Sequence, residues 1–81
     1  MIAPALTPPE EAVRAALTKL VKYHLAHPSG GFDPDDVSIH CRLSPNECQQ
    51  HLHTLTDAGL VNALDVEDFG SAYLTHYTLP L

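Results

Sequence analysis

The chain carries the same helix-start signal three times, with caps at Thr7, Asp33 and Ser44. In each copy a proline follows the capping side chain directly, and an acid lies three residues beyond the cap. The cap accepts a hydrogen bond from a free amide of the first turn, the proline presets the helical φ, and the acid favours the positive end of the helix dipole. Three helices are therefore predicted.

Apolar spacing predicts which side of each helix is buried. The first helix should run to about His27, with an inward stripe of Val13, Ala16, Leu17, Leu20, Val21 and His24. The second should end near Arg42, with inward residues Val37, His40 and Cys41. The third should end at Gly59, with inward residues Cys48, Leu52 and Leu55. Only two or three residues would separate the last two helices, which is typical of a helix-turn-helix.

After Gly59 the pattern changes to strands. Residues 60–66 and 72–79 are rich in Leu, Val, Tyr and Thr and flank a turn-like segment, which predicts a hairpin whose Tyr77 and Leu79 cover the helices. The predicted fold is α+β, mostly α: a winged helix-turn-helix of three helices followed by a two-stranded wing. We expect one domain over 1–81, with a frayed lead-in at 1–7, the helix-turn-helix at about 34–58 and the wing at about 60–79.

The charge balance argues against a typical DNA-binding surface. Four Lys and Arg face ten Asp and Glu, a formal net charge of -6. From residue 31 onward Arg42 is the one cation, so this part of the chain is strongly acidic. We find no apolar run of about 18 residues and no secretory signal, so a cytoplasmic protein with no membrane partner and with reduced cysteines is expected.

The stretch 43–61, LSPNECQQHLHTLTDAGLV, resembles the helix-turn-helix of bacterial repressors of the ArsR and MarR type. In that family a leucine and a serine open the recognition helix, a histidine-leucine pair follows, and alanine-glycine-leucine-valine closes the segment. The later TLPL resembles the end of the family's second wing strand. The resemblance implies that the third helix enters a major groove, and the candidate DNA contacts are Arg42, Asn46, Gln49, Gln50 and His53. The amides suit adenine, whose N6 and N7 they can pair with.

The phosphate clamps expected of that family are missing, because the third helix has no Lys or Arg. The alternative is an acidic winged-helix module, such as an adaptor, an inhibitor or a DNA mimic, that docks onto another protein without binding DNA. Its candidate partner contacts are Phe32, Ile39, Glu67, Asp68 and Phe69. The charge favours the protein-binding module, but base rate ranks the DNA-binding transcriptional regulator first, and both hypotheses stay open.

Other chemistry has little support in the sequence. The six histidines and two cysteines show no tight zinc-ligand spacing beyond Cys48 to His51, so no metal or cofactor is expected. Ser, His and Asp occur in no recognisable catalytic frame, and no phosphate-binding loop is present, so the chain is not expected to be an enzyme. A homodimer, if one forms, would use the first helix or the hairpin edge.

Overall fold

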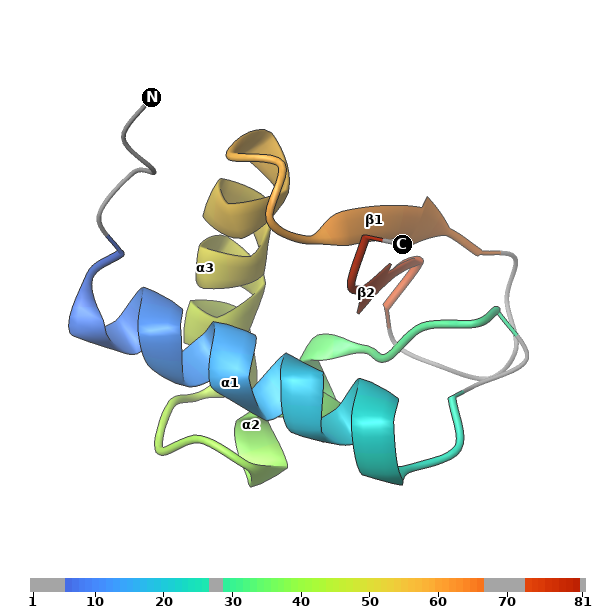
Figure 1. Cartoon of the computed structure of the whole chain (residues 1–81), viewed down its shortest axis with the longest axis horizontal. Helices are drawn as coiled ribbons and strands as arrows, with labels where there is room; N and C mark the ends of the chain where they lie inside the picture. The colour runs from blue at the N-terminus through green and yellow to red at the C-terminus, as the bar shows by residue number, and fades with distance from the viewer. Residues whose placement is uncertain (1–5, 27–28, 67–72, 81) are drawn as a thin grey trace.

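The computed structural model describes residues 6–26, 29–66 and 73–80. It contains helices α1 (Pro8–Tyr23), α2 (Pro34–Ile39) and α3 (Pro45–Asp57), followed by strands β1 (Asn62–Asp65) and β2 (Thr75–Thr78). Helix α1 crosses in front of α2 and α3, and the hairpin lies to one side of the helices (Figure 1). This mostly helical α+β layout is the predicted one. No helix in the described ranges is long and apolar enough to cross a membrane.

All three helices begin where their caps predict. At α3 the Ser44 hydroxyl accepts a hydrogen bond from the Glu47 amide at 3.2 Å, and the Glu47 carboxylate accepts one from the Ser44 amide at 3.4 Å. At α2 the Asp33 carboxylate accepts the amide of Asp36 at 2.9 Å. These bonds satisfy first-turn amides that have no partner inside the helix, which is why the helices start there.

The helix ends differ from the prediction. Helix α1 stops at Tyr23 rather than near His27, because the backbone becomes extended at His24 (φ -126°, ψ 153°). The helical periodicity that placed His24 inward ends there, so this side chain is exposed, and Val21, at the edge of the stripe, is 38% exposed. The predicted burial of these two residues is wrong.

Helix α2 also ends early, at Ile39 rather than near Arg42. The amides of His40 and Cys41 bond to carbonyls three residues back, at 3.1 and 3.4 Å, which tightens the last turn and ends the helix. The connection to α3 therefore spans residues 40–44, longer than the two or three residues predicted. His40 and Cys41 remain half-buried in this turn.

The core lies between the helices and the hairpin. Val13, Leu17, Val37, Cys48, Leu52 and Leu55 are each 0% exposed, with Val61 and Tyr77 beside them. The strands pair antiparallel with Ala63 opposite Tyr77, and Tyr77 is buried while Leu79 packs half-buried against the core. The predicted inward positions of α3 and β2 are confirmed.

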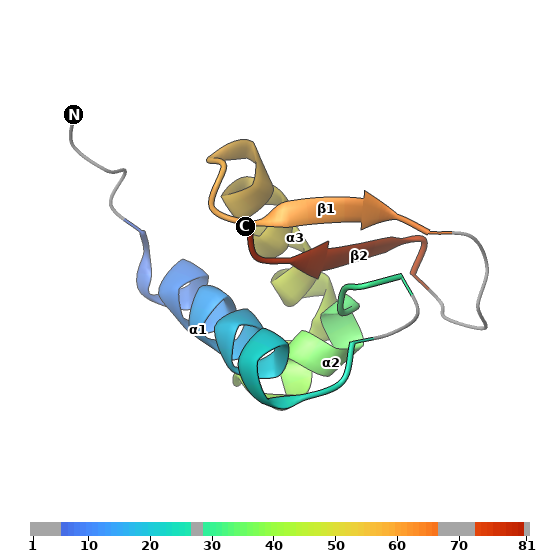
Figure 2. The ribbon, with the colours of Figure 1, turned by 45° about the vertical axis from the view of Figure 1, so that its right-hand side comes forward.

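A third segment joins the hairpin, which the sequence analysis did not predict. Phe32 and Tyr77 form an antiparallel bridge with N to O distances of 2.8 and 2.7 Å. Figure 2 shows this segment, which connects α1 to α2, running beside β2. Gly31 is buried beneath the bridge, and an added Cβ would lie 3.0 Å from the Tyr77 carbonyl oxygen. The bridge carries Phe32 into the core, where it is 3% exposed.

Candidate interaction surfaces

The outer side of α3 displays the polar residues that the sequence analysis assigned to DNA contact. Asn46, Gln50 and His53 are exposed and follow one another at helical spacing, opposite the buried stripe of the same helix. Gln49 is half-buried on the shoulder, and Arg42 is exposed in the turn before the helix. The structure thus brings Asn46, Gln50 and His53 onto one face and leaves the other two candidates beside it.

This α3 face, defined here by the exposed residues Asn46, Glu47, Gln50, His53 and Asp57, is acidic. Two carboxylates lie on it, and no Lys or Arg occurs anywhere within Pro45–Asp57. Binding to a phosphate backbone depends on cations that displace condensed counterions. The face has hydrogen-bonding groups that could read bases and lacks the charge that would hold a duplex.

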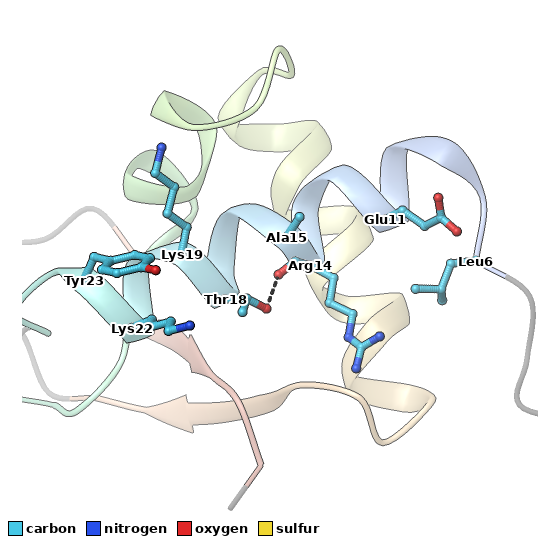
Figure 3. A pocket seen from close by; sticks show the side chains of 8 residues that line it. All are labelled: Leu6, Glu11, Arg14, Ala15, Thr18, Lys19, Lys22 and Tyr23. Atoms are coloured by element: carbon cyan, nitrogen blue, oxygen red, sulfur yellow. Dashed lines mark hydrogen bonds between the residues drawn. The ribbon is translucent and has the colours of Figure 1, made fainter.

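Three of the four basic residues lie on α1 instead. Arg14, Lys19 and Lys22 are exposed on this helix and line a hollow of about 550 Å³, together with Leu6, Glu11, Ala15, Thr18 and Tyr23 (Figure 3). The Lys22 ammonium lies 5.5 Å from the centre of the Tyr23 ring, within range of a cation-π contact. No role was predicted for these cations from the sequence, where their clustering within nine residues was the available signal.

The proposed protein-partner residues divide into three groups. Phe32 is buried, so its predicted exposure is wrong: the bridge to Tyr77 turns it into the core. Ile39 is 76% exposed and lines a shallow groove of about 460 Å³ with Leu20, His24, Leu25, Phe32, Asp36 and His40. Glu67, Asp68 and Phe69 lie outside the described residues.

Histidine and cysteine side chains meet in pairs. The rings of His24 and His40 have centroids 5.3 Å apart, where the end of α1 approaches the end of α2. The sulfur atoms of Cys41 and Cys48 lie 3.3 Å apart. Burial, followed by the contact with Cys41, raises the pKa of the Cys48 thiol to about 12. Among the described residues no group of three His, Cys, Asp or Glu could hold a metal ion.

His76 was missed as a buried residue. It is 1% exposed, and its Nδ1 lies 2.6 Å from the Ser29 hydroxyl, in the same loop that carries the bridge to β2. Side chains alternate along a strand, so His76 lies on the opposite face of the hairpin from Tyr77. That face would be exposed to solvent if the hairpin had only two strands. The loop covers that face, and no local signal predicts it.

Comparison of the chain with protein-family models and with the curated proteins finds no match. The fold is therefore known from the structure itself. The likeness to ArsR and MarR repressors remains a resemblance carried by residues 43–61.

Proposed function

We propose that this chain is an acidic winged-helix interaction module that docks its α3 face onto a basic protein surface. One observation carries the proposal: three of the four Lys and Arg lie on α1, whereas the exposed side of α3 presents Glu47 and Asp57 and no cation. The helix that would approach a partner in a winged-helix repressor thus has the charge sign that repels nucleic acid.

The same face suits a protein with Lys or Arg on its surface. Complementary charge speeds encounter and excludes partners of like charge, while the exposed amides of Asn46 and Gln50 can hydrogen-bond to backbone or side chains. Helix α3 is held firmly enough to serve as a docking element, because its inward residues Cys48, Leu52 and Leu55 are fully buried.

Site-specific photo-crosslinking tests the proposal. A benzophenone amino acid replaces Gln50 on the α3 face, or Ala15 on the exposed side of α1 as the control position. We expect a discrete crosslinked protein from position 50 and none of the same mass from position 15, with Asp57→Lys reducing the yield at least about tenfold. Asp35→Lys makes the same charge change on α2 and should leave the yield within about twofold. Equal crosslinking from both positions would contradict docking through α3.

DNA binding by a regulator of the ArsR or MarR type is the second candidate. It is favoured by two exposed amides one helical turn apart, Asn46 and Gln50, which have the chemistry to read adenine. The test is fluorescence anisotropy with mixed duplexes at low salt, at about pH 5.5 and about pH 7.5, which span the range in which a histidine ordinarily changes charge. Binding that Gln50→Ala weakens supports this candidate, and no binding at either pH refutes it.

A further inference from the structure

Two thiols meet where the turn after α2 packs against α3. Cys41 lies in this turn and Cys48 lies near the start of α3, with their sulfur atoms 3.3 Å apart. The Cys41 thiol is also 3.3 Å from the Val37 carbonyl, to which it donates. Cys48 is 0% exposed, whereas Cys41 is half-buried. Solvent therefore reaches Cys41, whereas Cys48 is closed off from it and lies against Cys41.

We propose that Cys41 and Cys48 are a dithiol that a hydroperoxide oxidises reversibly to an intramolecular disulfide. The S–S bond of a disulfide is about 2.05 Å long, so the two sulfurs must approach each other by a further ~1.3 Å. Residues 41–43 are bends outside any helix, so the backbone of Cys41 has room to supply this movement while α3 holds Cys48. We therefore expect formation of the disulfide to require a local adjustment of this turn and no rearrangement of the core.

Cys41 reacts first, because it is the partly exposed cysteine of the two. Its thiolate attacks one oxygen of hydrogen peroxide: an S–O bond forms, the O–O bond breaks, and the departing hydroxide takes up the thiol proton as water. The sulfur of Cys48 then attacks the sulfenic sulfur of Cys41. An S–S bond forms, the S–O bond breaks, and a second water leaves with the Cys48 proton, so two electrons pass from the thiols to the peroxide.

The second step should be the slower one near neutral pH. Burial raises the pKa of the Cys48 thiol, so its thiolate is scarce at pH 7 and becomes about tenfold more abundant with each pH unit. A sulfenic acid on Cys41 should therefore live longer at low pH. Dimedone, which reacts with sulfenic acids, should trap more of it there, whereas closure to the disulfide should win as the pH rises.

The chain offers a direct readout, because the one basic residue between the two cysteines is Arg42. Trypsin cleaves after it and separates Cys41, in peptide 23–42, from Cys48, in peptide 43–81. The full-length folded protein is treated with one equivalent of hydrogen peroxide and digested without reductant. We expect the two peptides to be linked, to separate after reduction, and to come from protein that runs as a monomer on a non-reducing gel.

Two variants and one physical measurement complete the test. Cys41→Ser should leave Cys48 unmodified, and Cys48→Ala should accumulate the dimedone adduct on Cys41. The oxidised wild type should keep its far-UV circular dichroism and unfold at a temperature at least about 5 °C higher, because the bond closes the loop 41–48 in the unfolded chain. Unlinked peptides with Cys41 in the sulfinic state, linkage only between copies, or loss of helix on oxidation would overturn the proposal.

Discussion

Phe32 and Ile39 are both apolar residues that the sequence placed among the candidate partner contacts, and the structure separates them sharply. Phe32, which forms the bridge to Tyr77, is 3% exposed, whereas Ile39 is 76% exposed at the end of α2. Replacing each by alanine should therefore have different consequences. Phe32→Ala should lower the free energy of unfolding, and Ile39→Ala should leave it nearly unchanged.

The magnitudes follow from burial. Removing a buried phenylalanine ring typically costs about 3–5 kcal/mol, from lost apolar burial and from the cavity left behind. A chain of this length has a total stability of roughly 4–12 kcal/mol, so Phe32→Ala should leave the fold marginal. Ile39 loses little buried area, and alanine has a slightly better helix propensity, so its change should stay within about 0.5 kcal/mol.

Urea denaturation followed by far-UV circular dichroism measures both changes. If Phe32→Ala does not fold, Phe32→Leu gives the same comparison on a smaller scale, at about 1 kcal/mol. A loss of less than about 1 kcal/mol for Phe32→Ala, or a larger loss for Ile39→Ala than for Phe32→Ala, would refute the assignment of the bridge segment to the core.

Three further predictions concern stability. Ser44→Ala should cost about 1 kcal/mol in urea denaturation by removing the α3 cap, while Ser44→Asp, which can also cap, should cost less; equal losses would contradict the capping argument. Gly31→Ala should cost about 1–3 kcal/mol, because its Cβ would press on the Tyr77 carbonyl oxygen that accepts the Phe32 amide. Gly30→Ala meets no atom within 4 Å, so it should cost only about 1 kcal/mol, from its φ of +89°; a larger loss at Gly30 than at Gly31 would count against crowding at the bridge. The free energy of unfolding should fall as the pH rises from 9.0 toward about 12, since the unfolded Cys48 thiol ionises at its ordinary pKa and the buried one does not. The contribution is at most about 1.4 kcal/mol per pH unit, and a pH titration of thermal unfolding in which Cys48→Ser shows the same slope would contradict it.

The features that could be predicted from the sequence are those that depend on residues close together in the chain. The starts at Thr7, Asp33 and Ser44 were predictable because a cap, a proline and an acid act within one helical turn. The buried stripe of α3 was predictable because 3.6-residue periodicity places Cys48 and Leu52 on one side. The outward position of Asn46 and Gln50 follows from the same geometry.

The helix ends could not be predicted in the same way. His24 continues an apolar stripe in the sequence, but the backbone leaves the helix at that residue. At the end of α2, bonds to carbonyls three residues back replace the helical ones and leave Cys41 in a turn, close to Cys48. A prediction from periodicity assumes that the helix continues. No strong stop signal lies within one turn of the end of α1 or of α2.

The order of the residues alone establishes where the helices start, which side of α3 faces the core, and that the acidic residues lie mainly after residue 31. Each of these depends on local hydrogen bonding, on helical periodicity or on composition. Packing between distant segments buries Phe32 and His76, and the end of α2 brings together two cysteines seven residues apart. The burial of Phe32 and His76 depends on a loop that pairs with a strand more than forty residues away, and the cysteine contact depends on where α2 stops. Neither leaves a periodic pattern in the residues involved.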